Sequence, residues 1–187
     1  IKSICEYYPI SGVTTNPSII AKAGLDLKTL ITKIREIIGN SMLHIQVLSE
    51  NCADMVDEGK RIVDFAGENT YIKIPVTEEG IKAIKTLKKL NYNITATAIF
   101  TPQQALIAAC AGADYVAPYI NRLDNISTNG VEIASNIHKI LQASNLKTEV
   151  LAASFSNVEQ IHMTTLHGVT TLTIAPNLFA KMLYHPM

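Results

Sequence analysis

Short apolar runs rich in β-branched residues recur along the chain, and segments with helical periodicity separate them. Seven such runs are predicted to be strands, at residues 12–15, 43–48, 71–76, 94–100, 115–120, 150–154 and 171–175. Between them, residues such as Ile81, Ile84 and Leu87 recur on one face of a predicted helix. Because each strand is followed by a helix, we expect parallel strands whose sheet is covered by helices.

Two architectures satisfy this alternation: a doubly wound open sheet and a closed barrel. A doubly wound nucleotide-binding protein is expected to show G-x-G-x-x-G or G-x-x-x-x-G-K-[ST] in its first turn, and neither motif occurs in this sequence. We therefore predict an α/β chain folded as a (β/α)8 TIM barrel, with residues 1–187 forming a single domain. A barrel needs an eighth strand, which we expect upstream of Ile1, because residues 1–8 are predicted to be a helix.

Capping residues support these helix boundaries. Residues 101–104 (TPQQ) and 156–159 (SNVE) each predict a capping box at a helix start. Left-handed residues are predicted at the helix ends marked by Gly39, Gly67, Asn91, Gly112 and Gly168.

Charge and cysteine content exclude several classes of protein. Lysine plus arginine equals aspartate plus glutamate at 16 each, so we expect no nucleic-acid or membrane partner. The uncharged stretch 91–113 is interrupted by polar residues and Pro102, so no membrane span is predicted. Cys5, Cys52 and Cys110 are odd in number and widely spaced, which is wrong for a disulfide framework or a zinc site and favours the cytoplasm.

Polar residues at the carboxyl ends of barrel strands are candidates for an active site, because that end of a barrel holds its catalytic groups. These residues are Thr14, Thr15, Asn16, Gln46, Lys73, Thr97, Tyr119, Asn121, Arg122 and Ser154.

Lys73 is the most informative of them. It lies within an otherwise apolar strand of a sheet that we expect to be buried on both faces. Burial lowers the pKa of a lysine and supplies the neutral amine that attacks a carbonyl group, so Lys73 is a candidate Schiff-base nucleophile. The alternative is a lysine that reaches solvent or pairs with an acid.

Other candidates have structural alternatives as well. Arg122 and Ser154 are suited to hold a phosphate group, but Arg122 could instead pair with Asp124. Tyr119 could serve only in packing. The histidines do not have metal-ligand spacing, since His44 alone lies on a predicted strand and His138, His162, His167 and His185 fall on helices or loops. We therefore expect no metal.

Five motifs occur in order along the whole chain: residues 12–18 (GVTTNPS), 71–77 (YIKIPVT), 113–119 (ADYVAPY), 121–124 (NRLD) and 151–155 (LAASF). With these motifs the chain resembles the transaldolase-like family, most closely its fructose-6-phosphate aldolase branch, a group of small class I aldolases. The resemblance implies a carbon–carbon bond reaction on a sugar phosphate, without a metal or organic cofactor. It also implies a homo-oligomer, a pentamer or decamer.

The resemblance further implies roles for individual residues. Lys73 is expected to form the Schiff base, and Tyr119, Gln46 and Thr97 to hold the water that transfers protons. Thr15 and Asn16 are expected to contact substrate, and Arg122 with Ser154 to bind its phosphate. Two family features are missing from this sequence: a first-strand Leu-Asp-Thr segment with an active-site aspartate, and a C-terminal helix after Met187.

The reaction expected from this resemblance is reversible cleavage of fructose 6-phosphate to dihydroxyacetone and glyceraldehyde 3-phosphate. The alternatives are a transaldolase of the pentose phosphate pathway and a non-catalytic barrel that binds sugar phosphates. Transaldolases of the family carry glutamate at the position of Gln46 and phenylalanine at that of Tyr119, so both residues favour the aldolase.

Overall fold

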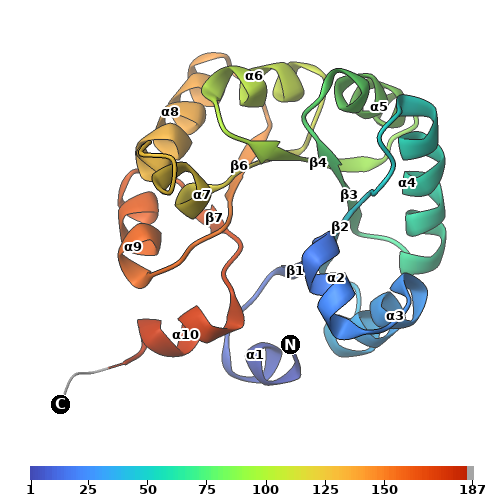
Figure 1. Ribbon diagram of the computed structural model, residues 1–187, viewed down its shortest axis with the longest axis horizontal. Coiled ribbons are helices and arrows are strands. Elements are labelled where there is room, and N and C mark those ends of the chain that lie inside the picture. The colour runs from blue at the N-terminus through green and yellow to red at the C-terminus, as the bar shows by residue number, and fades with distance from the viewer. Residues whose placement is uncertain (185–187) are drawn as a thin grey trace. The chain divides into compact units, whose positions relative to one another are not determined.

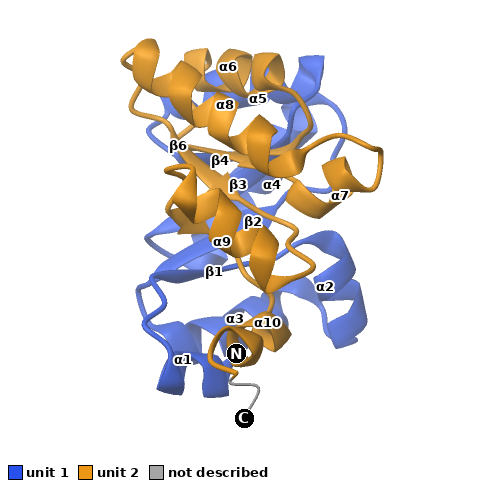
Figure 2. Cartoon of the chain, turned by 90° about the vertical axis from the view of Figure 1, so that its left-hand side faces the viewer, with its two compact units in different colours: residues 1–95 blue, residues 96–187 orange. Residues whose placement is uncertain are grey.

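The computed structural model describes residues 1–184, which divide into two compact units. The first unit is Ile1–Thr95, and the second begins at Ala96 (Figure 2). Strand β4 (Asn93–Ile99) runs through the boundary, so its first three residues belong to one unit and its last four to the other.

The first unit alternates strands with helices along the chain (Figure 1). It contains α1 (Lys2–Tyr7), β1 (Gly12–Thr14), α2 (Pro17–Ala23), α3 (Leu27–Ile38), β2 (Met42–Gln46), α4 (Cys52–Ala66), β3 (Thr70–Pro75) and α5 (Glu78–Lys89). Strands β1, β2 and β3 pair in parallel, with Thr14 opposite His44 and Gln46 opposite Lys73. Helices α4 and α5 pack against β3.

The second unit continues the alternation. It contains α6 (Pro102–Cys110), β5 (Tyr115–Pro118), α7 (Ile120–Asp124), α8 (Gly130–Ala143), β6 (Glu149–Ala152), α9 (Val158–Leu166), β7 (Thr171–Leu172) and α10 (Pro176–Met182). Strands β5, β6 and β7 also pair in parallel, and an isolated bridge joins Tyr119 to Ala153 just beyond β5 and β6.

In β2 and β3 apolar and polar side chains alternate, so each of these two strands has an apolar face and a polar face. In the first unit Ile45, Ile72 and Ile74 are fully buried, and Gly59 of α4 lies against the side chain of Ile72. The alternate positions of these strands carry His44, Gln46, Tyr71 and Lys73. The same register therefore builds the core on one face and gathers the polar side chains on the other.

The seven predicted strands are confirmed in residues 1–184, and their order follows the chain from β1 to β7. The fold class is thereby confirmed as α/β, with the alternating parallel topology of a partial (β/α)8 barrel. The eighth strand upstream of Ile1 and the single domain stay predictions.

The capping positions predicted from the sequence are confirmed at all but one place. The capping box at Thr101 and Gln104 is confirmed, and Gly39, Gly67, Asn91, Gly112 and Gly168 all have positive φ. The capping box predicted at residues 156–159 is wrong by one residue. Asn157 is the N-cap and accepts from the Gln160 N–H at 2.8 Å, because an asparagine caps a helix as well as a serine does.

No helix in residues 1–184 combines the length and the apolar character needed to cross a membrane.

Candidate active site

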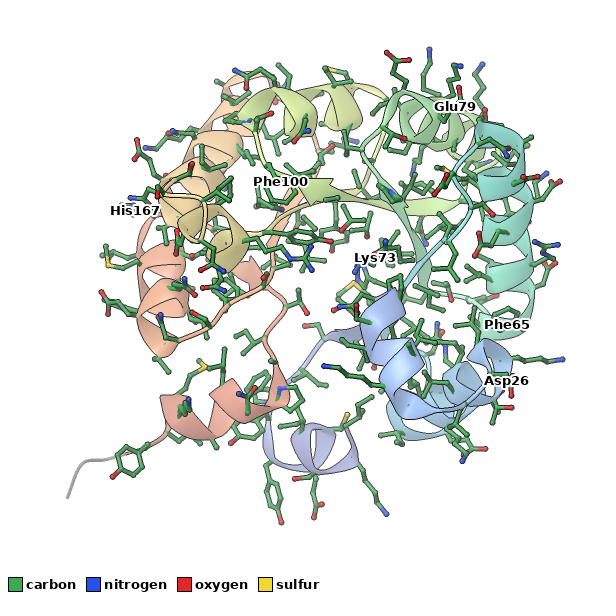
Figure 3. All side chains as sticks on the ribbon, in the orientation of Figure 1. Asp26, Phe65, Lys73, Glu79, Phe100 and His167 are labelled. Carbon is green, nitrogen blue, oxygen red and sulfur yellow. The ribbon has the colours of Figure 1, made fainter. Side chains whose placement is uncertain are left out.

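Lys73 lies in the middle of β3 and is only 7% exposed. Its Nζ donates to the main-chain oxygen of Thr15 at 2.8 Å. Burial lowers the pKa of Lys73 from 10.5 to about 8. Its side chain leaves β3 on the side away from α4 (Figure 3). Within residues 1–184 Lys73 forms no ion pair. The alternative, in which Lys73 reaches solvent or pairs with an acid, is therefore wrong.

The segment after β1 fixes the acceptor of that hydrogen bond. The N–H and the Oγ1 of Thr15 both donate to the His44 main-chain oxygen, at 2.8 and 3.1 Å. Asn16 is the N-cap of α2, where its Oδ1 accepts from the Ile19 N–H at 2.8 Å. The structure thus brings Thr15 to Lys73, and it shows Asn16 with its side-chain oxygen engaged by the helix.

A polar cluster that the sequence reasoning did not identify lies on the face of Lys73. The His44 ring stacks on the Tyr71 ring, with centroids 4.6 Å apart, and its Nδ1 lies 2.8 Å from the Thr95 Oγ1. Burial, and secondarily the charge of Lys73, lower the pKa of His44 to about 3, so the imidazole is neutral. Strand alternation in the sequence indicates this cluster. His44 and Tyr71 precede Gln46 and Lys73 by two residues, and residues two apart on a strand lie on the same face.

Gln46 ends β2 and is opposite Lys73 in the strand register. It is half-buried, and its side chain forms no hydrogen bond with any residue in 1–184. The backbone that follows is fixed by Glu58 of α4, which accepts from the N–H groups of Leu48 and Ser49 at 2.9 to 3.0 Å. Gln46 therefore has a positioned backbone and an amide able to orient a water molecule.

In the second unit, Thr97 and Tyr119 form a hydrogen-bonded pair. The Thr97 Oγ1 lies 2.9 Å from the Tyr119 hydroxyl, and Thr97 is fully buried. Phe100 (Figure 3) meets the Tyr119 ring edge to face, with centroids 5.8 Å apart. Ala98, directly after Thr97, has a φ of 57°, which is strained for a residue other than glycine. Thr97 and Tyr119 are thus in direct contact, and their expected role in holding a water together with Gln46 stays a prediction.

Arg122 is exposed on the short helix α7, and its Cζ lies 4.6 Å from the centroid of the Tyr119 ring. The alternative pairing with Asp124 is wrong, because the ion pairs described within residues 1–184 do not include Arg122. The Asp124 carboxylate instead accepts from the Gly130 N–H at 2.8 Å and from the Gln160 side chain at 2.6 Å. The guanidinium is therefore available to an anionic ligand.

Ser154 lies just beyond β6 with a φ of 64°, a left-handed conformation. Its main-chain oxygen accepts from the Asn121 N–H at 2.9 Å, which joins this loop to the start of α7. Arg122 and Ser154 thus come from segments that are hydrogen-bonded to one another.

The remaining histidines are dispersed. His138 lies on α8, His162 on α9 and His167 at the end of α9, while His185 lies outside the described residues. Within residues 1–184 no three histidine, cysteine, aspartate or glutamate side chains are grouped closely enough to hold a metal ion.

Parallel β/α topology together with a buried, unpaired lysine on a polar strand face is typical of barrel enzymes that react with carbonyl compounds. The sequence matches the family described as Transaldolase/Fructose-6-phosphate aldolase over residues 1–187. The chain belongs to this family of enzymes.

Individual relatives carry both activities in their names. The chain is 37% identical to a probable fructose-6-phosphate aldolase of Streptococcus pneumoniae, over 100% of this chain and 85% of the relative. It is 36% identical to a probable transaldolase of Exiguobacterium sp., over 100% of this chain and 86% of the relative. A probable transaldolase of Clostridium perfringens is 39% identical, over 95% of this chain and 82% of the relative.

Proposed function

We propose that the chain is a class I aldolase that cleaves and forms fructose 6-phosphate, with Lys73 as the nucleophile. The main support is Lys73 itself, a buried amine with a pKa of about 8 and no carboxylate partner within residues 1–184. Such an amine is partly neutral at physiological pH, and a neutral amine adds to a ketone.

The proposed reaction proceeds through an imine. The Lys73 Nζ adds to the keto carbon C2 of fructose 6-phosphate, and loss of water leaves a protonated imine. Removal of the proton of the C4 hydroxyl breaks the C3–C4 bond and releases glyceraldehyde 3-phosphate, while the bonding electrons move into an enamine. Protonation of the enamine at C3 and hydrolysis of the imine release dihydroxyacetone and regenerate Lys73.

Proton transfer in this proposal is assigned to Tyr119. Its hydroxyl has Thr97 as a hydrogen-bond partner at 2.9 Å, which suits a group that gives and takes a proton. Gln46 has no titratable proton, so its role is to orient the water through which the transfer occurs. Thr15 and Asn16 are proposed to contact the substrate chain, and Arg122 and Ser154 its phosphate.

The second candidate is a transaldolase, which passes the three-carbon unit to an acceptor aldehyde instead of releasing it. The observation in its favour is that relatives at 36% and 39% identity are named probable transaldolases. Gln46 and Tyr119 favour the aldolase, because the family's transaldolases carry glutamate and phenylalanine at these positions.

The experiment that tests the proposal measures dihydroxyacetone released from fructose 6-phosphate, with and without erythrose 4-phosphate as acceptor. We expect release without an acceptor in the unaltered protein and in the control Lys85→Met, which changes an exposed lysine, but none in Lys73→Met. Gln46→Glu, which supplies a carboxylate at the proposed water, should shift the products toward transfer. If dihydroxyacetone were released only in the presence of erythrose 4-phosphate, the aldolase assignment would fail and the transaldolase assignment would take its place.

We also propose the cytoplasm as the compartment. Support comes from Cys5, Cys52 and Cys110, all of which are free thiols in the structure. Fractionation of cells that produce the protein, followed by immunoblotting, tests this, and recovery outside the cytoplasmic fraction would contradict it.

A further inference from the structure

Gln160 of α9 uses both ends of its side-chain amide inside the second unit. Its Oε1 accepts from the N–H of Ser156 at 2.8 Å and from the Ser156 hydroxyl at 3.2 Å. Its Nε2 donates to the Asp124 Oδ2 at 2.6 Å and to the Asn121 Oδ1 at 3.4 Å. Gln160 is only 9% exposed, so these hydrogen bonds are shielded from water.

Helix α7, which carries Arg122, depends on such contacts for its position. It has five residues, too few for a helix that is stable by itself. Its first turn is held by main-chain hydrogen bonds from Ile120 to Ala153 and from Asn121 to Ser154, each 2.9 Å long. Its last residue, Asp124, is held by the Gly130 N–H at 2.8 Å and by Gln160.

The residues that Gln160 contacts flank the proposed phosphate-binding groups in sequence. Asn121 and Asp124 lie on either side of Arg122 along α7, and Ser156 lies two residues beyond Ser154. One buried amide therefore connects the helix that carries the guanidinium to the loop that carries the serine (Figure 1 shows α7 and α9). A change at Gln160 should alter the relative placement of Arg122 and Ser154 without touching either.

We propose that Gln160 is a positioning residue that sets the phosphate affinity of the site by holding α7 and the loop after β6 together. This inference rests on the proposed function, in which Arg122 and Ser154 bind the substrate phosphate. It adds that recognition of the phosphate depends on an amide that never contacts the substrate.

The pattern of donors and acceptors requires a glutamine at position 160 when position 124 is an aspartate. The Ser156 N–H needs an acceptor, and the Asp124 carboxylate needs a donor. Gln160→Glu places two carboxylates against each other. The two oxygens of Asp124 accept from two donors, the Gly130 N–H and the Gln160 Nε2. In Asp124→Asn one of these oxygens becomes an NH2 group, so one of the two donors faces another donor. The double change Gln160→Glu with Asp124→Asn restores a partner for the N–H groups of Ser156 and Gly130 and for the side chain at position 124, and the weaker 3.4 Å bond to the Asn121 Oδ1 is the one that it does not restore.

The test measures the affinity for inorganic phosphate by calorimetry, and KM for glyceraldehyde 3-phosphate and for unphosphorylated glyceraldehyde with dihydroxyacetone as donor. Arg122→Ala serves as the reference for loss of phosphate binding. We expect Gln160→Glu, the uncharged Gln160→Met and Asp124→Asn each to weaken phosphate binding on the order of tenfold. The KM for glyceraldehyde should stay unchanged, and the double variant should come within about threefold of the unaltered protein.

Asp124→Asn separates positioning from simple electrostatics. Removing a negative charge next to the site should strengthen phosphate binding if charge alone matters. Positioning predicts the opposite, a weaker phosphate affinity in Asp124→Asn. Adding Gln160→Glu to that variant should restore the phosphate affinity, although it adds a negative charge. Melting temperatures of all variants check that each one folds.

Several results would overturn the inference: tighter phosphate binding in Asp124→Asn, a double variant no better than the singles, or equal KM increases for both aldehydes. An unaltered protein that binds no phosphate would overturn it together with the role of Arg122. Failure of the proposed function looks different, since it would remove imine trapping with dihydroxyacetone while the phosphate affinities still followed the predicted order.

Discussion

Lys73 is held in surroundings that disfavour its charge. Burial lowers its pKa from 10.5 to about 8, although a hydrogen bond to the Thr15 carbonyl favours the protonated form. At pH 7 an amine with such a pKa is neutral in roughly 10% of molecules, about 300-fold more than an ordinary lysine. The nearby His44, with a pKa of about 3, is neutral at this pH, so it places no second positive charge beside Lys73.

The first prediction concerns the pH dependence of imine formation. Only the neutral amine attacks, and the neutral fraction rises with pH. The second-order rate constant for trapping dihydroxyacetone on Lys73 should therefore rise up to a pH of about 8 and level off above it. Single-turnover borohydride trapping across this range measures it. A rate constant that keeps rising up to the ordinary pKa of lysine would contradict the lowered value.

The second prediction concerns Tyr119. Tyr119→Phe removes the hydroxyl that contacts Thr97 and keeps the ring that lies against Phe100 and Arg122. If the hydroxyl transfers protons, kcat should fall by a factor of about 10² to 10⁴, the usual magnitude of general acid–base catalysis. Steady-state kinetics with fructose 6-phosphate measure this, and a control melting temperature should change little. A nearly silent substitution would remove Tyr119 from the mechanism.

At the scale of elements, the ends of strands and the starts of helices place the functional groups. Lys73, Gln46 and Thr97 lie in or at the end of strands, and the loops after β2, β4 and β6 are each held by one side chain of the following helix. These side chains are Glu58, Gln104 and Gln160, and each accepts from main-chain N–H groups of the loop before its helix. The helices therefore fix the loops as well as covering the sheet.

The third prediction tests where α9 begins. Asn157 accepts from the Gln160 N–H, so Asn157→Ala should lower the free energy of unfolding by about 0.5 to 2 kcal/mol, as loss of an N-cap does. Ser156→Ala should lower the free energy of unfolding by less. The N–H of residue 156 that donates to the Gln160 Oε1 belongs to the main chain, so this hydrogen bond survives the change. Urea unfolding of both variants measures the difference. A larger loss for Ser156→Ala would restore the capping box predicted from the sequence.

For the whole molecule, the sequence predicts that the two units fold as one domain. Strand β4 is shared between Ile1–Thr95 and the unit that begins at Ala96, and a shared strand cannot be half formed in a stable fold. We therefore expect the units to unfold together.

The fourth prediction follows from this expectation. Ile72→Val of the first unit and Ile137→Val of the second remove one buried methylene group each, at about 0.5 to 1.5 kcal/mol. If the chain is one cooperative unit, either substitution should shift the entire unfolding transition. The transitions followed by far-ultraviolet and by tyrosine near-ultraviolet circular dichroism should then coincide. A transition that splits, with only one part shifted by each substitution, would contradict a single domain.

The order of elements could be predicted from the sequence because each depends on local signals. Periodicity located all seven strands, and all but one of the helix boundaries predicted from capping residues are confirmed. The unusual position of Lys73 was visible too, since a lysine inside an apolar strand is conspicuous. Side-chain partners were less accessible, because hydrogen bonds such as His44 to Thr95 join residues 51 positions apart. The partner of Asp124 was missed for the same reason: Gln160 lies 36 positions away.

The central claim is that Lys73 forms a covalent imine with the substrate, and trapping it tests the claim most directly. The protein is incubated with fructose 6-phosphate or dihydroxyacetone, reduced with borohydride, digested and analysed by mass spectrometry, with Lys73→Met as the control. We predict a stable three-carbon or six-carbon adduct on Lys73 and none in the variant, because reduction turns only an imine into a permanent amine. An unlabelled Lys73, or equal labelling of the exposed Lys82 and Lys85, would contradict the assignment.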